Sequence, residues 1–415
     1  MTYFGELASN WNRLLGTCIA LGMGAAISFF TVSLFGPALI ADLGWTKSGF
    51  ALVGSVPMIS VFTLPFVGRF ADRVGPRVAG TIGFTVLTLC FVAFANMHGS
   101  LWEFLVITAI LSIFGVMTSS LVFGRVIVDR FDKARGLALS IMMSTSPLAG
   151  AIVAPFIGKV IAQSGWRSGY YALAVISAFG GLLALSLIGR ADYAKAKAKE
   201  LVPLRMSKAE FLTIARNPVF PMMMLGMLLV NVPQTFASAQ LKLVALDKGV
   251  SDTYATWLVS LYPLGSIIGR FLCGIGLDRL KSHVVAMITL GIPTLSFVVF
   301  GLGSPAMGLL VPAVLVIGLA QGAEGDVGAY IISRRFDAKN FSLLYAFMNM
   351  TVSAGTGIGA LILSATLHQG FDYQPYIIVC GITTLAGALL FGLTGVTGPG
   401  PEEAIPALGF EHTGE

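Results

Sequence analysis

The sequence predicts an all-α integral membrane protein with twelve transmembrane helices in two six-helix halves. Composition, the spacing of apolar runs and an internal repeat all support this. Of the 415 residues, 56% are hydrophobic and only 11% are charged, and the mean hydropathy is +0.85. A soluble globular chain carries about 25% charged residues. This composition excludes an ordinary cytosolic enzyme.

Apolar runs long enough to cross a bilayer follow one another along the chain. A membrane-spanning helix needs about 20 apolar residues, and the runs lack the alternating pattern of barrel strands. Only helices and closed barrels satisfy their backbone groups within lipid, so these runs are predicted helices. The twelve expected spans are 14–41, 49–67, 78–97, 101–127, 137–162, 170–188, 219–241, 253–275, 284–302, 307–332, 343–367 and 376–393.

The first apolar run and the cysteines have simple interpretations. That run is too long for a signal-peptide core of about 7–15 residues, so we expect it to remain as a span. The four cysteines lie in apolar runs and lack the spacing of metal ligands. We therefore expect them to act as small hydrophobic side chains. They are Cys18, Cys90, Cys273 and Cys380.

Basic residues are unevenly distributed between the two sides. The N-terminus and the loops after every second span hold twenty of the 26 Lys and Arg residues. Five fall on the other side, namely Lys47, Lys159, Arg167, Lys242 and Lys248, and Arg270 lies inside a span. The positive-inside rule places both termini in the cytoplasm. The net charge of +6 is attributed to anionic lipid and not to nucleic acid.

An internal repeat divides the chain. Gly68, Asp72 and Arg73 match Gly274, Asp278 and Arg279 at an offset of 206, and two later loops match at 205. Coincident offsets indicate a duplicated unit, the arrangement of transporters whose halves rock about a central site. The expected domains are a first half at 1–189, a cytoplasmic linker at 190–217, a second half at 218–396 and a cytoplasmic tail at 397–415.

The loop after the second span carries a recognisable motif. Residues 68–77 read GRFADRVGPR, which resembles the G-x3-D-R-x-G-x-R loop of the major facilitator superfamily. A loop of this kind latches one side of the protein, and a purely topogenic loop is the alternative. We therefore expect gating roles for Asp72, Arg73, Arg77, Asp278 and Arg279.

Further segments narrow the resemblance. Residues 131–138 (FDKARGLA) are similar to the F-x-K-R-R-x-L-A entry of monocarboxylate porters, with Ala134 where a basic residue is usual. Segments 43–48, 269–279 and 322–326 resemble those of bacterial monocarboxylate and oxalate:formate type carriers. We therefore expect the protein to lie in a bacterial inner membrane. The resemblance implies an organic anion that carries a carboxylate and usually moves with a proton.

Arg270 is the strongest candidate for binding that anion. An arginine inside a span costs about 2.5–3.5 kcal/mol on insertion scales unless it faces water or a partner. A substrate carboxylate docked bidentately would offset that cost, and the resemblance points to this residue. The alternatives are a structural ion pair with an acid at 322–326 and a side chain that reaches the interface.

Glu324 and Asp326 are the candidate proton carriers, because burial favours the neutral form of a carboxyl group. Two positions of about 100° each place them about 200° apart on a helix, so we expect only one to contact the substrate path. Other candidates for the substrate site are polar or aromatic residues of the predicted spans. They are Gln234, Tyr262, Tyr330, Tyr345, Asn349 and Phe29, with interhelical packing as the alternative role.

Two departures from the family pattern favour a monoanion. Spans 14–41 and 343–367 contain no lysine, so Arg270 stands as the one clear intramembrane cation and a dianion would leave a charge unpaired. We predict a proton-coupled symporter of a monocarboxylate or related organic anion that works by alternating access. The alternatives are a proton-driven exporter of amphipathic compounds and a receptor with a transporter fold. No phosphate loop, metal cluster or nucleophile elbow is visible, so we expect no cofactor, no metal and no enzymatic activity. The expected partners are a small carboxylate, protons and lipid, with no nucleic acid, and the protein is expected to be a monomer.

Overall fold

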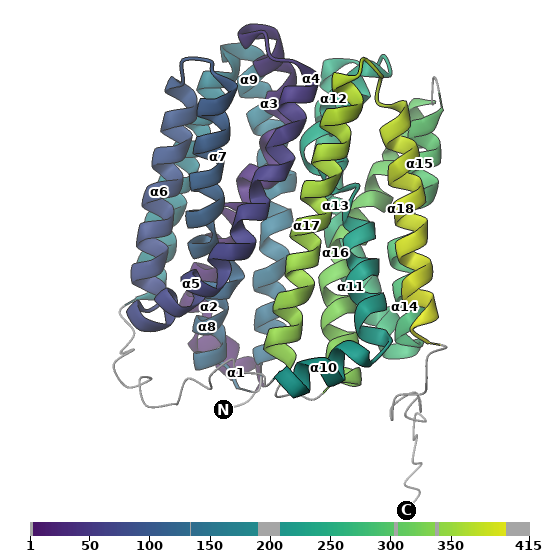
Figure 1. Cartoon of the computed structure of the whole chain (residues 1–415). Helices are drawn as coiled ribbons and strands as arrows, with labels where there is room; N and C mark the ends of the chain where they lie inside the picture. Colours follow the sequence, from purple (N-terminus) through teal and green to yellow (C-terminus); the bar gives the residue numbers. More distant parts are fainter. Residues whose placement is uncertain (1–2, 133, 190–207, 303–305, 337–339, 396–415) are drawn as a thin grey trace, which may run out of the picture.

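The computed structural model describes residues 3–132, 134–189, 208–302, 306–336 and 340–395. Within these ranges the chain is helical and contains no β-strand. The first helix, α1 (Tyr3–Ser9), and the end of the last, α18 (Gln374–Leu393), lie at the same end of the bundle (Figure 1). We call this the terminal end. The predicted all-helical class is confirmed.

The helices form two halves that follow the chain order, coloured purple to blue and teal to yellow in Figure 1. The first half consists of α1, α2 (Trp11–Gly22), α3 (Ala26–Leu43), α4 (Lys47–Ala51), η1 (Leu52–Met58), α5 (Ile59–Val74), α6 (Pro76–Asn96), α7 (Leu101–Gly115), η2 (Val116–Thr118), α8 (Ser120–Arg130) and α9 (Arg135–Ile188). The second consists of α10 (Lys208–Arg216), α11 (Val219–Asn231), η4 (Phe236–Gln240), α12 (Leu241–Asp247), α13 (Asp252–Arg279), α14 (Ser282–Gly291), α15 (Pro293–Gly301), α16 (Met307–Arg335), α17 (Phe341–His368) and α18.

Eleven helical stretches in the described chain are long and apolar enough to cross a membrane. The longest, α9, consists of two helices that meet at Gly165, where φ is 81°. Glycine adopts this left-handed conformation without steric cost. Each of the twelve predicted spans therefore has a helical counterpart. Helix α10 lies within the predicted linker, while residues 190–207 and the predicted tail from 397 lie outside the described residues.

Proline interrupts several spans. Pro293 begins α15 directly after α14, and Pro233 follows the end of α11, ahead of the π-helical turn η4. Proline cannot donate a helical hydrogen bond, which explains both breaks. The predicted end of the seventh span at Leu241 is wrong, because α12 continues the helix to Asp247. That continuation places Lys242 in a helix and not in a loop.

Helix α1 is fixed to the junction of α8 and α9 by Glu6. Its two carboxylate oxygens accept the backbone N–H groups of Asp132 at 2.7 Å and Ala134 at 2.8 Å. Ala134 is fully buried. Glu6 thus holds α1 against the turn that leads from α8 into α9.

The two halves meet at the end opposite the termini. Lys47 Nζ of α4 lies 2.5 Å from Asp247 Oδ1 of α12, and the backbone N–H of Lys242 donates to Ser33 Oγ of α3 at 2.9 Å. Helix α17 also packs against α4 and η1 of the first half. This end of the interface is closed.

Candidate functional site

An ion pair lies inside the second half, where α13 crosses α16. Arg270 Nε is 3.8 Å from Asp326 Oδ2, and the two side chains are 26% and 39% exposed. Within the described part of the chain, Arg270 Nε is buried and has no hydrogen-bond partner. The contact is electrostatic and leaves the Nε–H donor unused. The structure therefore joins the predicted substrate-binding residue to one of the two predicted proton carriers.

Glycines allow α13 and α16 to approach this closely. A Cβ atom on Gly269 would overlap the carbonyl oxygen of Leu319, and one on Gly322 would overlap that of Ser266. Small residues at a crossing permit backbone contact between membrane helices. Because Gly269 precedes Arg270 and Gly322 lies one turn before Asp326, the crossing sets the position of the pair.

Tyr345 and Asn349 of α17 lie beside this pair. The Tyr345 hydroxyl is close to Gly325 of α16 and within electrostatic range of both Arg270 and Asp326. Asn349 Nδ2 donates to the backbone oxygen of Tyr345 at 2.8 Å. The structure thus gathers four of the predicted site residues at one place, which we call the arginine cluster: Arg270, Asp326, Tyr345 and Asn349.

A second polar group follows a chain of hydrogen bonds. Gln234 Nε2 donates to the Tyr262 hydroxyl at 3.0 Å, and that hydroxyl donates to Gln321 Oε1 at 2.9 Å. Gln321 Nε2 then donates to Glu324 Oε1 at 2.8 Å. The donor–acceptor direction is the same in all three bonds, from Gln234 through Tyr262 and Gln321 to the Glu324 carboxylate. We call these four residues the glutamate chain.

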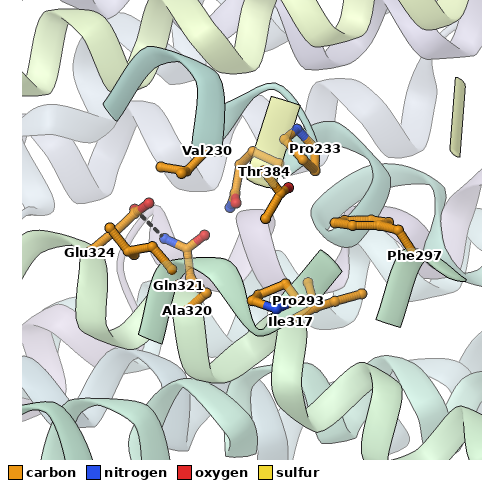
Figure 2. A pocket seen from close by; sticks show the side chains of 11 residues that line it. Val230, Pro233, Pro293, Phe297, Ile317, Ala320, Gln321, Glu324 and Thr384 are labelled. Atoms are coloured by element: carbon orange, nitrogen blue, oxygen red, sulfur yellow. Dashed lines mark hydrogen bonds between the residues drawn. The ribbon is translucent and has the colours of Figure 1, made fainter. Parts of the chain in front are cut away.

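A small cavity of about 30 Å³ lies at the end of the glutamate chain (Figure 2). Its walls come from the segment around Pro233 and from α14, α15, α16 and α18, all of the second half. The polar lining residues are Gln234, Gln321, Glu324 and Thr384. Glu324 and Asp326 consequently have different surroundings, one at this cavity and the other at Arg270.

The other predicted site residues lie apart from both groups. The Phe29 ring packs edge-on against Phe30 at 5.1 Å between centroids, and Phe30 lies 6.1 Å from the ring of Tyr262. Arg334 sits over the ring of Tyr330 at 5.3 Å. Phe30 therefore connects the first half to the glutamate chain.

The predicted gating residues lie near the terminal end. Arg73, Asp278 and Arg279 are exposed and Arg77 is partly buried. The side chain of Asp72 lies outside the described residues. Their gating role stays a prediction.

Three polar residues of importance were missed from the sequence. Lys242 was placed in a loop, but its side chain is 4% exposed and pairs with Asp252 Oδ1 at 2.8 Å. Gln321 and Asn231 were also overlooked. An isolated lysine or amide within an apolar run is the signal that would have identified them.

Known proteins share the fold and the sequence pattern. The chain is 24% identical over 383 residues to the Agnestins efflux protein of Paecilomyces divaricatus, covering 90% of this chain and 84% of that protein. It is 24% identical over 395 residues to Monocarboxylate transporter 3 of Rattus norvegicus, covering 92% and 79%. The crystal structure of the nucleoside transporter NupG (D323A mutant) superposes with a TM-score of 0.76 at 16% identity, covering 92% and 99%.

The family model described as Major Facilitator Superfamily matches residues 19–324 and 223–412. These two matches cover most of the chain and both six-helix halves. The chain belongs to the Major Facilitator Superfamily of transporters.

Proposed function

We propose that the protein is a proton-coupled symporter of a monocarboxylate or a related organic anion, working by alternating access. The observation that carries this proposal is the arginine cluster. A partly exposed guanidinium lies within a span and contacts one carboxylate at 3.8 Å without a hydrogen bond from its buried Nε. Arginine binds carboxylates best through two parallel N–H donors, and this contact does not use that geometry.

A substrate carboxylate competes with Asp326 for Arg270. Hydrogen bonds between charged groups are about twice as strong as neutral ones, so a bidentate substrate displaces an acid held only by charge. Tyr345 lies within reach as a neutral hydroxyl. The cluster holds one cation, Arg270, and one anion, Asp326, so it is neutral without substrate. A bound monoanion adds one negative charge, and a proton that binds with it restores neutrality.

Proton entry keeps the loaded site neutral. Glu324 and Asp326 are the acids available to take that proton, since both lie on α16 within or beside the site. One proton with one monoanion moves no net charge. A gradient of one pH unit is worth about 1.4 kcal/mol and accumulates substrate about tenfold.

The orientation is part of this proposal. The excess of basic residues on the side of the termini places the terminal end in the cytoplasm. The far end, closed by Lys47 and Asp247, then faces outward. We assign the protein to the inner membrane of a bacterium on the resemblance of its motifs to bacterial carriers.

A proton-driven exporter of amphipathic compounds is the second candidate. This candidate is supported by the name of the Agnestins efflux protein. That protein is 24% identical to this chain, the same identity as Monocarboxylate transporter 3. In an exporter of this kind protons and substrate compete, whereas in a symporter they bind together.

Uptake into proteoliposomes separates the two candidates. Labelled lactate, pyruvate, octanoate and benzoate are tested with acid buffer outside or inside. Acid outside should accelerate uptake of at least one acid and raise its final accumulation by about tenfold per pH unit. Acceleration only by acid inside identifies the exporter, and no carboxylate transport under either gradient rejects the symporter.

A further inference from the structure

Thr384 of α18 presents an unused hydroxyl group at the cavity beside the glutamate chain. The residue lines this cavity and is only 2% exposed. Its Oγ1 is buried and has no hydrogen-bond partner among the described residues. A buried hydroxyl that makes no hydrogen bond is unfavourable, so a small polar ligand in the cavity would be stabilised by this group.

The preceding residue of α18 provides a direct comparison. Thr383 Oγ1 donates to the backbone oxygen of Val379 at 2.9 Å, which is a common way for a threonine hydroxyl to be satisfied inside a helix. Thr384 lies in the same helix, but within the described chain its hydroxyl makes no bond of this kind. The Thr384 hydroxyl therefore remains available to a ligand in the cavity, whereas that of Thr383 does not.

The size and polarity of the cavity suit water. A buried water needs about 10–15 Å³ of such volume and about two to four polar partners. The cavity has about 30 Å³, which is room for about two waters. Pockets for organic ligands occupy about 300–1,000 Å³, so an organic anion does not fit. Besides Thr384, the polar lining residues are Gln234, Gln321 and Glu324.

The Glu324 carboxyl group borders the same space as Thr384 (Figure 2). Its Oε1 accepts a hydrogen bond from Gln321 Nε2 at 2.8 Å. A carboxylate offers about four acceptor positions on its two oxygens, so this bond leaves positions at which a water can donate. Thr384 and Glu324 together supply the two polar partners that a bound water needs.

We propose that this cavity is a binding site for water, held between the Thr384 hydroxyl and the Glu324 carboxyl group, and that Glu324 exchanges its proton with this water. Thr384 is then a positioning residue that acts through the water. On proton uptake an O–H bond of a hydrated proton breaks, its electron pair stays on water, and an O–H bond forms on Glu324. Release reverses these steps. The proposal deepens the symport function above and rests on it for the physiological meaning of the proton.

The cavity gives the proton a route separate from that of the substrate. Its lining residues all belong to the second half. In the proposed function the substrate meets Arg270, which lies 3.8 Å from Asp326 and is not among the lining residues. The anion and the proton therefore reach α16 at two different places.

Glu324 is the one ionisable residue among those that line the cavity. Other charged or titratable groups within electrostatic range of it are Arg270 and Tyr262 on α13 and Tyr345 on α17. Asp326 lies two residues further along α16. The lining residues from α14, α15 and α18 carry no ionisable side chain. A proton that enters the cavity thus has Glu324 as its acceptor.

Infrared spectroscopy of the purified protein tests this without any substrate. The band of neutral carboxyl groups is followed at acid pH after transfer from H₂O to D₂O, and Glu324→Gln identifies the component that belongs to Glu324. In Thr384→Val, which removes the hydroxyl and retains the shape, deuteration of this component should slow about tenfold or more, the scale of one lost hydrogen bond. Ala320→Val, which fills the cavity from α16, should slow it as well.

Two matched variants serve as controls. Thr384→Ser keeps a hydroxyl and should retain rapid exchange. Thr383→Val removes the hydroxyl that is satisfied within the helix and should leave exchange at the native rate.

A second measurement detects the water itself. Spectra recorded in ordinary water and in water containing ¹⁸O should differ by an O–H stretching band of bound water. This band should be present in native protein, Thr384→Ser and Thr383→Val, and absent from Thr384→Val.

Three results overturn the proposal. They are no carboxyl component lost in Glu324→Gln, native exchange in Thr384→Val, and an ¹⁸O-sensitive band that is unchanged in Thr384→Val. Slow exchange in Thr384→Val but not in folded Ala320→Val also rejects it, because the hydroxyl would then contact the carboxyl group directly. Failure of the symport function appears separately, as absent carboxylate uptake by native proteoliposomes, and leaves these spectra unchanged.

Discussion

Lys47 of α4 and Asp247 of α12 form an ion pair of 2.5 Å that bridges the two halves at the end opposite the termini. Lys47 also lies over the ring of Tyr373 at 5.3 Å. The two charged side chains are 43% and 35% exposed, so the pair contributes at most about 1 kcal/mol. It is a contact that transport can break in each cycle, and a covalent link in its place is expected to stop the cycle.

A reversible crosslink between Lys47→Cys and Asp247→Cys should reduce uptake at least tenfold, and reduction should restore it. Alternating access requires this end to open. The native cysteines are buried, so they compete little for the reagent. Labelled substrate uptake before and after reduction provides the measurement.

The matched control joins two helices of the same half. Asp42 Oδ2 of α3 and Arg167 Nη1 of α9 lie 3.3 Å apart. A crosslink between cysteines at these two positions should leave uptake unchanged. If the crosslink at 47 and 247 is equally harmless, the halves do not separate at this end.

Asp326→Asn should strengthen carboxylate binding by up to about tenfold, or ~1.4 kcal/mol. The substitution removes the acid that competes for Arg270 and retains the shape of the side chain. The partial exposure of the pair limits the gain, because solvent screens exposed charges. Competition for labelled substrate in counterflow gives the affinity, with Glu103→Gln on the surface as control. Weaker binding would show that Asp326 orients the arginine and does not compete with substrate.

Gly322→Ala and Gly269→Ala should each destabilise the protein by about 1–3 kcal/mol and abolish uptake. The added Cβ atoms overlap backbone oxygens across the α13–α16 crossing, and overpacking of this kind forces helices apart. Gly274→Ala on the same helix is the control, since a Cβ there meets nothing within 4 Å. Thermal unfolding of the purified variants measures the effect, and equal Tm values for all three would contradict the assigned role of the crossing.

The sequence predicts the twelve spans closely because hydropathy governs which segments enter lipid. Arg270 and Glu324 stand out for the same reason, as charges within apolar runs. The end of the seventh span was misplaced because a break at Pro233 and the π-helical turn η4 redirect the helix without ending it. Lys242 was thereby assigned to a loop.

The partners of these residues were not predictable from the sequence. Arg270 meets Asp326 because glycines set how α13 and α16 cross, and the hydropathy pattern carries no information on that crossing. Tyr262 bonds to Gln321, which is 59 positions away in the sequence. Single amides in apolar runs identify candidates for such contacts but not their partners.

The most direct test of the account is ligand-induced thermal stabilisation of native protein, Arg270→Ala and Arg167→Ala by lactate, pyruvate, octanoate and benzoate. Arg167 is an exposed arginine at the far end and serves as the matched control. We predict that at least one acid raises the Tm of native protein and Arg167→Ala, and that this rise is lost in Arg270→Ala. An undiminished rise in Arg270→Ala would contradict a substrate site at this arginine.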